Sequence, residues 1–136
     1  MDEIPQGFVP LYRSSPFLDA IGPFFCRGSG SGLVLGLRTA PRHVNSRGLA
    51  HGGLLASVAD TALGYALESV VQQPASRGVT ASLSLDFAGS AKLGDWIEST
   101  VDIQKIGTRL AFANAYLSVG ETRIVRASAV FLMAEK

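Results

Sequence analysis

The chain has 136 residues, of which 47% are hydrophobic, 8% aromatic and 17% charged. Twelve Lys and Arg against eleven Asp and Glu give a net charge of +1, which excludes the strongly basic surface that nucleic acid binding requires. The length predicts one domain, and the low charged fraction predicts apolar surface shared with another subunit. We therefore expect a soluble homo-oligomer.

The cysteine count and the N-terminus indicate the compartment. Cys26 is the single cysteine, so an intramolecular disulfide is excluded and a reducing compartment is favoured. The first five residues carry two acids and a proline, unlike a signal peptide. The most apolar long window, residues 52–71, contains Asp60 and Glu68, which argues against a membrane span. We expect a cytoplasmic protein without membrane association.

The N-terminal region divides into an arm and the start of the domain. Residues 1–13 contain two prolines and a glycine and are predicted to form an extended arm, while residues 14–136 form the single domain. Ser15 followed by Pro16 is typical of a helix N-terminus, and Gly22-Pro23 ends the short helix that begins there.

A glycine-serine run, residues 28–32, lies between two predicted strands, residues 24–27 and 33–39. It is similar in composition to a phosphate-binding loop, but a dinucleotide fingerprint requires a helix directly after the glycines. A strand-like segment follows here, so we predict a flexible hairpin turn. The chain also contains no Gly-x-Ser-x-Gly elbow, so the sequence does not support an activated serine.

Residues 50–72 form the one long helix that the sequence predicts. Its apolar side chains cover more than half of the circumference, so the helix is expected to be nearly buried. A narrow stripe of small or polar residues consists of Ser57, Thr61, Gly64 and Glu68. Asp60 lies about 60° to one side of this stripe, at the apolar margin. A carboxylate in that position is a candidate catalytic group.

After the helix, the apolar period changes from 3.6 to 2, which indicates strands. We predict four strands joined by short turns, at residues 79–87, 97–104, 110–119 and 122–133. The element order is β-β-α-β-β-β-β, and an antiparallel meander of this kind is expected to curve around the long helix. The sequence therefore predicts an α+β fold.

The segment before the long helix carries the strongest chemical signal. Gly52 and Gly53 at the helix start allow close approach of a ligand, and free N–H groups there suit a carbonyl oxygen that gains charge. Asp60 could activate a water molecule or attack directly. The alternative is a glycine-rich helix entry with an unrelated acid.

The spacing of these groups has a consequence for assembly. Gly52 and Asp60 are eight residues apart, or ~12 Å along one helix, so one reacting carbonyl cannot touch both. If both serve one site, they come from two chains whose helices lie side by side and antiparallel. This spacing predicts a dimer with two sites.

The histidines do not predict a metal site. His43 and His51 are the only two, and no cysteine pair or acidic cluster joins them at the spacing of metal ligands.

The pattern Asn45-x-x-Gly48-x-x-His51-Gly52-Gly53, followed by Asp60, resembles the phenylacetate-pathway (PaaI-like) branch of hotdog-fold acyl-CoA thioesterases. The resemblance spans residues 14–134. It implies the hotdog fold and hydrolysis of an acyl-CoA to a free acid and coenzyme A, with coenzyme A as part of the substrate and no separate cofactor. It also implies a homodimer or a homotetramer built as a dimer of dimers.

The resemblance assigns roles to single residues. The Gly52 N–H would polarise the thioester carbonyl, and Asp60 of the opposing subunit would be the general base or nucleophile. Asn45 would place the carbonyl, or the sulfur leaving group together with His51, although His51 could instead only bond the backbone.

Thr80 corresponds to a family Ser or Thr that holds the attacking water beside the acid. The period-2 pattern, however, places Thr80 in phase with Ser82, Ser84 and Asp86, so it could equally be an exposed strand threonine.

One segment departs from the family. The branch often has an aromatic residue, a basic residue and a Pro-Ala pair where this chain has Phe87-Ala88-Gly89-Ser90-Ala91. This difference affects the acyl pocket or the coenzyme A groove. Four cations are candidates for contacts with coenzyme A phosphates: Lys92, Lys105, Arg109 and Arg123.

Two other functions remain open from the sequence. A hotdog enoyl-CoA hydratase or dehydratase would use a histidine and an acid, but neither histidine has that family's sequence context. A non-catalytic acyl-CoA binding protein would use the same pocket without turnover.

Overall fold

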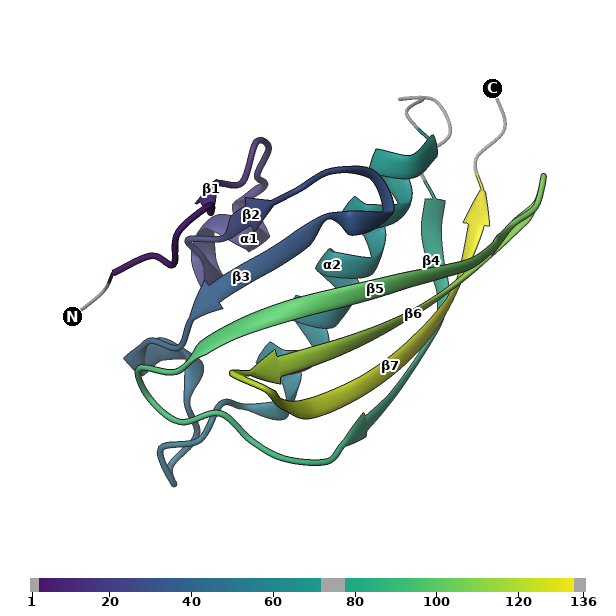
Figure 1. Ribbon diagram of the computed structural model, residues 1–136. Coiled ribbons are helices and arrows are strands. Elements are labelled where there is room, and N and C mark those ends of the chain that lie inside the picture. The colour runs from purple at the N-terminus through teal and green to yellow at the C-terminus, as the bar shows by residue number, and fades with distance from the viewer. Residues whose placement is uncertain (1–2, 72–77, 134–136) are drawn as a thin grey trace.

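The computed structural model describes residues 3–71 and 78–133 (Figure 1). The helices are α1 (Pro16–Ile21), α2 (Gly52–Val71) and two short 3₁₀ turns, η1 (Gly30–Gly32) and η2 (Pro41–His43). The strands are β1 (Val9–Pro10), β2 (Phe25–Arg27), β3 (Val34–Arg38), β4 (Gly78–Phe87), β5 (Trp96–Ile106), β6 (Leu110–Val119) and β7 (Thr122–Met133).

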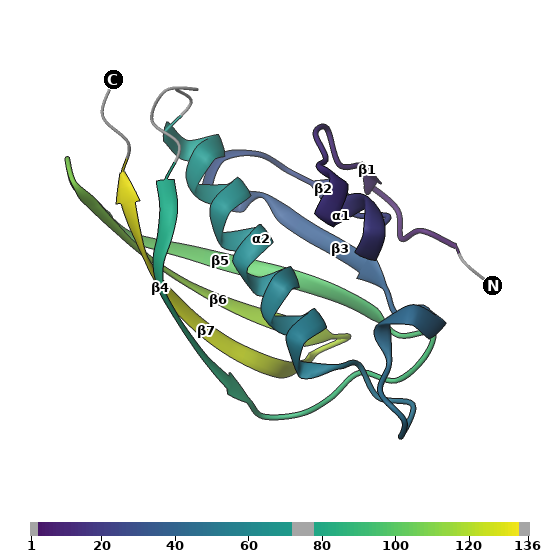
Figure 2. The ribbon, with the colours of Figure 1, turned by 180° about the vertical axis from the view of Figure 1, so that it is seen from behind.

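The strands form one antiparallel sheet in the order β1-β2-β3-β5-β6-β7-β4. The two views show the sheet curved around α2, which lies across its concave face (Figures 1 and 2). This confirms the predicted α+β arrangement. The sheet has one strand more than the pattern predicts, because Val9 and Pro10 of the arm pair with Cys26 and Phe25.

The core lies between α2 and the sheet. Eight residues of α2 are buried: Leu54, Leu55, Val58, Ala59, Ala62, Leu63, Ala66 and Leu67. The strands beneath contribute several small residues: Ala111, Ala113 and Ala115 from β6, and Ala127 and Ala129 from β7. Small side chains at these positions let the backbone of the helix approach the sheet closely.

The length and composition of α2 also satisfy the criteria for a membrane span, with a mean hydropathy of 1.3 over its most apolar window. In the structure, the apolar face of α2 packs on the sheet. The helix is therefore used as the core helix of the domain.

The structure moves several predicted boundaries. The helix α2 begins at Gly52, two residues later than expected, because Ala50 and Leu49 form isolated antiparallel bridges with Val44 and Lys92. The first predicted strand begins at Phe25, and the second is shortened to Val34–Arg38. Residues 72–77, which include the predicted helix end and the loop after it, lie outside the described residues.

The glycine-serine run is not the freely flexible turn that its composition predicts. Residues 30–32 form the 3₁₀ turn η1, and the Gly30 N–H donates to the Ser69 hydroxyl at 2.7 Å. The bond ties the β2–β3 hairpin to the last turns of α2. A run of small residues suits this contact because no side chain holds the turn away from the helix.

The arm packs on the outer face of the sheet. Phe8 meets the Trp96 ring edge-on, with 5.1 Å between ring centroids, and the Arg27 guanidinium lies 4.6 Å from the Phe8 ring centroid. Gly36 on β3 lies beneath them. A Cβ atom there would clash with the indole of Trp96 and lie 2.9 Å from the Phe8 ring. Gly36 therefore lets the two aromatic rings rest on the strand.

We expect the substitution Gly36→Ala to lower the free energy of unfolding by about 1–3 kcal/mol, because Trp96 and Phe8 must move. Gly32→Ala is the matched control, since a Cβ at Gly32 meets nothing within 4 Å. Chemical denaturation of both variants at one protein concentration measures the difference. Equal midpoints for the two variants would contradict this account of the packing.

Candidate active site

A bulge in β4 decides which way Thr80 points. The pairing of β4 with β7 shifts between Thr80 and Ser82, so that Thr80 opposes Phe131 and Ser82 opposes Val130. The extra residue reverses the phase of the strand. Thr80 therefore shares the concave face with Leu83, which packs against the core. The prediction that Thr80 is in phase with Ser82 and Asp86 is wrong for this reason.

Thr80 on β4 and Asp60 on α2 form a hydrogen bond on the concave side of the sheet. The Thr80 hydroxyl donates to Asp60 Oδ1 at 2.8 Å, and both residues are partly buried. Within the described residues, Oδ2 of Asp60 has no hydrogen-bond donor. The bond holds the carboxylate in place, and the second oxygen stays available to a water molecule or a substrate.

The start of α2 leaves the Gly52 N–H free. His51 Nδ1 accepts the Gly53 N–H at 2.8 Å and so caps the second residue of the helix. The Gly52 N–H has no acceptor among the residues that the structure describes, and Gly52 is exposed. The phenyl ring of Phe87 lies beside it, since a Cβ on Gly52 would be 3.7 Å from that ring.

Asn45 holds the loop that precedes the helix. Its Oδ1 accepts the N–H groups of Arg47 at 2.9 Å and of Leu49 at 3.2 Å. The Ala50 N–H donates to the Ala91 carbonyl, which fixes the loop to the connection after β4. The side-chain oxygen of Asn45 is thus used by the loop, and its NH₂ group is the part that could reach a ligand.

The predicted site residues gather into two groups, and the two groups lie apart on the molecule. Asp60 and Thr80 form one, at the middle of α2, and the loop with Asn45, His51 and Gly52 forms the other, at its start. Gly52 and Asp60 are eight positions apart on one continuous helix, which corresponds to ~12 Å.

A cavity of about 350 Å³ lies beside Asp60 and Thr80. Its walls come from α2, from β4 and β7, and from the segment that leads into α1. They include Arg13, Ser14, Ser15, Phe17, Leu18, Gly64, Tyr65, Glu68, Gly78 and Phe131. An acid with one hydrogen-bonded oxygen at the wall of such a cavity is suited to proton transfer or nucleophilic attack.

His43 is a structural residue. Its Nδ1 accepts the Ala40 N–H at 2.8 Å, and its Nε2 lies 2.6 Å from the Ile21 carbonyl oxygen, to which it donates. Burial lowers the pKa of His43, and the nearby charge of Arg42 acts in the same direction, while the bond to Ile21 opposes both. Within the described residues, no group of three His, Cys, Asp or Glu side chains could hold a metal ion.

The family model described as "Thioesterase superfamily" matches residues 47–126, which contain Gly52, Asp60 and Thr80. The chain belongs to the thioesterase superfamily. A Pseudomonas aeruginosa protein named "Putative esterase PA0474" is 48% identical over 132 residues, which cover 96% of this chain and 98% of that protein.

Two further proteins are similar to this chain. Acyl-coenzyme A thioesterase 13 of Mus musculus is 31% identical over 86 residues, which cover 63% of this chain and 60% of the mouse protein. The crystal structure of a hypothetical thioesterase with coenzyme A from Streptococcus pneumoniae has a TM-score of 0.78 at 18% identity, and covers 87% of this chain and 91% of that chain. The expected hotdog fold is confirmed.

In this thioesterase-superfamily chain, the four cations considered for coenzyme A lie apart. Lys92 is beside the loop before α2, through the bridge with Leu49. Arg123 stacks on Tyr116, 3.7 Å from the ring centroid. Lys105 and Arg109 lie at the other end of the sheet, where the Arg109 carbonyl accepts from the last residue of β7. Of these four cations, Lys92 is the one that lies next to the helix start within one chain, because its bridge partner Leu49 precedes Gly52 by three residues.

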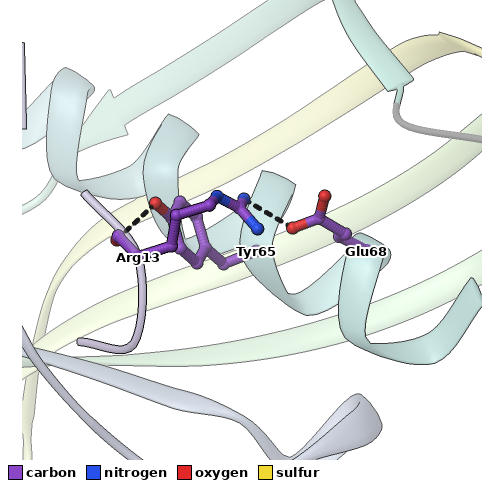
Figure 3. A network of polar contacts seen from close by, with 3 residues as sticks. All are labelled: Arg13, Tyr65 and Glu68. Carbon is purple, nitrogen blue, oxygen red and sulfur yellow. Dashed lines mark hydrogen bonds and ion pairs between the residues drawn. The ribbon is translucent and has the colours of Figure 1, made fainter. Parts of the chain in front are cut away.

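Sequence reasoning missed the part of the cavity wall that Arg13, Tyr65 and Glu68 form. Figure 3 shows Arg13, from the predicted arm, meeting Tyr65 and Glu68 of α2. Arg13 donates to Glu68 Oε1 at 2.6 Å, and the Tyr65 hydroxyl donates to the Arg13 carbonyl at 2.8 Å. The position of Glu68 on the small and polar stripe was the only signal, and nothing in the sequence links it to Arg13.

We expect stability to depend on pH through His43. The folded state disfavours the charged ring, so the unfolded chain takes up the proton first as the pH falls below about 6.5. The contribution of His43 is therefore present at neutral pH and lost as the pH falls. We therefore expect the free energy of unfolding, measured with urea between about pH 7 and pH 5, to have a shallower slope against pH in His43→Gln than in the wild type.

The matched control for this measurement is Arg47→Gln, because Arg47 is exposed and an arginine side chain does not lose its proton in this pH range. That variant should keep the wild-type slope. If His43→Gln also keeps it, the buried ring does not contribute to the acid sensitivity.

Proposed function

We propose that this chain is an acyl-CoA thioesterase of the PaaI-like branch, and that it hydrolyses a thioester to a free acid and coenzyme A in the cytoplasm. The observation that carries the proposal is the Thr80–Asp60 hydrogen bond at the wall of a cavity. The free Gly52 N–H supports it. The similarity to the mouse acyl-coenzyme A thioesterase and to a thioesterase crystallised with coenzyme A supports the choice of substrate class.

The groups divide the chemistry between them. The Gly52 N–H donates to no acceptor among the described residues, so it is free to donate to the thioester oxygen as that oxygen gains negative charge. Asp60 takes a proton from water that attacks the carbonyl carbon, or attacks the carbon itself, and Thr80 holds the carboxylate in position. The carbon–sulfur bond then breaks, and the coenzyme A thiolate takes up the proton that Asp60 removed from the water. If Asp60 attacks the carbon itself, the thiolate takes its proton from solvent, and a water molecule then hydrolyses the anhydride between the acyl group and Asp60 to the free acid.

The distance between Gly52 and Asp60 along α2 favours an active dimer. One thioester cannot reach both groups of one chain, but it can reach Gly52 of one subunit and Asp60 of another. Two surfaces are suited to the contact. The outer side of α2 carries small residues, and β4 is a ten-residue strand at the sheet edge with Val79 64% and Phe87 52% exposed. Edges of this length are usually covered in native assemblies.

The hydratase alternative needs a histidine that can move a proton. His43 is buried and both of its ring nitrogens are engaged, which leaves His51 with one free nitrogen. No contact of His51 with an acid is present in the described residues. The binding-protein alternative is tested directly by turnover.

We expect Asp60→Asn to lower kcat on a good acyl-CoA by about 10²–10⁴-fold, because it keeps the shape and removes the base or nucleophile. Thr80→Val, which removes the hydrogen bond to Asp60, should lower kcat by roughly 10-fold or more. Release of coenzyme A thiol measures both. Asp86→Asn is the control, since Asp86 pairs with Arg126 in an exposed ion pair.

Unchanged turnover in Asp60→Asn would remove Asp60 from the mechanism. If the wild type binds acyl-CoA tightly but releases no thiol, the chain is an acyl-CoA binding protein and not a thioesterase.

Subunit complementation tests the shared site. Gly52→Pro removes the N–H at the first helical position, where proline is tolerated. We expect Gly52→Pro and Asp60→Asn to be nearly inactive alone. Mixed dimers have one intact site, so an equal mixture after subunit exchange should recover about a quarter of wild-type activity.

Differently tagged chains confirm that mixed dimers have formed. No recovery in a sample that contains them would mean that Gly52 and Asp60 do not share a site across subunits.

A further inference from the structure

The segment before α1 lines one side of the cavity beside Asp60. The Arg13 guanidinium, which forms the ion pair with Glu68, lies 4.9 Å from the centroid of the Tyr65 ring. The Tyr65 hydroxyl in turn donates to the Arg13 carbonyl (Figure 3). We call these three residues the Arg13 network. It links the arm to α2 through one ion pair, one ring contact and one hydrogen bond, at the end of the cavity away from Thr80.

The polar groups of this wall already have partners. Glu68 balances the charge of Arg13, and its side chain is only 18% exposed. Ser14 donates to Asp19 at 2.6 Å, and the Ser15 hydroxyl accepts the Leu18 N–H at 3.2 Å. The wall therefore offers no free cation to a negatively charged acyl group. A buried carboxylate without a partner would be costly, so the cavity favours an uncharged group.

The remaining walls are apolar and compact. Phe17, Leu18 and Phe131 line the cavity together with two glycines. Its 350 Å³ lies near the lower end of the ~300–1,000 Å³ that ligand pockets span. A short, branched or aromatic group fits such a volume, whereas a long alkyl chain must pass the Arg13 network.

Gly64 provides space next to the carboxylate. It lies one helical turn after Asp60, so both residues are on the same side of α2. A Cβ built on Gly64 meets no heavy atom within 4 Å. Glycine inside a helix costs about 1 kcal/mol relative to alanine. The packing within the chain does not require this glycine, and it lines the cavity.

We infer that Gly64 and the Arg13 network determine the size of the acyl group, and that the cavity accepts a compact uncharged acyl group and rejects long or charged ones. The inference rests on the proposed thioesterase function. Gly64 leaves space one helical turn after Asp60, and the Arg13 network lines the cavity at the next turn of α2. Both are specificity-determining positions, because neither donates a group to the reaction.

The test is a thiol-release profile with five substrates: butanoyl-, benzoyl-, octanoyl-, hexadecanoyl- and succinyl-CoA. The wild type should prefer benzoyl- and butanoyl-CoA to hexadecanoyl- and succinyl-CoA by about 10-fold or more in kcat/KM. Gly64→Val should lower kcat/KM for benzoyl-CoA by roughly 10-fold and affect butanoyl-CoA less, because the added methyl groups fill the space. Arg13→Ala should raise the kcat/KM for octanoyl-CoA several-fold relative to the kcat/KM for butanoyl-CoA.

Two matched controls separate specificity from general damage. Gly32→Val adds the same bulk at a glycine outside the cavity whose Cβ would meet nothing within 4 Å, and Arg126→Ala breaks an exposed ion pair on β7. Both should keep the wild-type profile. Size-exclusion chromatography follows the oligomeric state of every variant.

The outcomes distinguish the two levels of proposal. If the wild type hydrolyses none of the five substrates, the proposed function fails. If it hydrolyses them and prefers hexadecanoyl- or succinyl-CoA, or if Gly64→Val and Arg13→Ala keep the wild-type profile, thioesterase activity stands and the size assignment is overturned. Dissociation of the oligomer in Gly64→Val alone would also overturn the role of Gly64 and place it in the subunit contact.

Discussion

The packing of the apolar face of α2 on the concave face of the sheet is the interaction on which the rest of the structure depends. Each fully buried Leu or Val contributes about 1.5–3 kcal/mol before chain entropy is counted, and eight residues of the helix are buried. The alanines of β6 and β7 let the helix lie close to the strands. Once this face is buried, the rotation of the helix is fixed, and so is the position of every residue on its margin.

The site follows from that rotation. Asp60 comes to lie at the margin that faces β4, and the bulge after Thr80 turns one hydroxyl toward it. The helix start carries Gly52, whose N–H stays free because His51 caps Gly53 instead. Both parts stand on one rigid helix, which holds them too far apart to act on one carbonyl.

The arm has two attachments, and they have different consequences. Its outer attachment is the pairing of β1 with β2 and the contact of Phe8 with Trp96, which add to the sheet without touching the site. Its second attachment, through Arg13, reaches over the edge of α2 to Tyr65 and Glu68. The same segment that extends the sheet therefore also forms a wall of the cavity.

Local patterns in the sequence determined the elements. The change of apolar period from 3.6 to 2 separates α2 from the strands, and glycines before an acid-bearing helix single out Gly52 and Asp60. Tertiary structure alone decided the orientation of Thr80, since a period of 2 assumes a strand without a bulge. It also decided the partner of Arg13, because Glu68 lies 55 residues away in the chain. Periodicity records which face of an element is apolar, and it carries no information on which distant side chains the fold brings together.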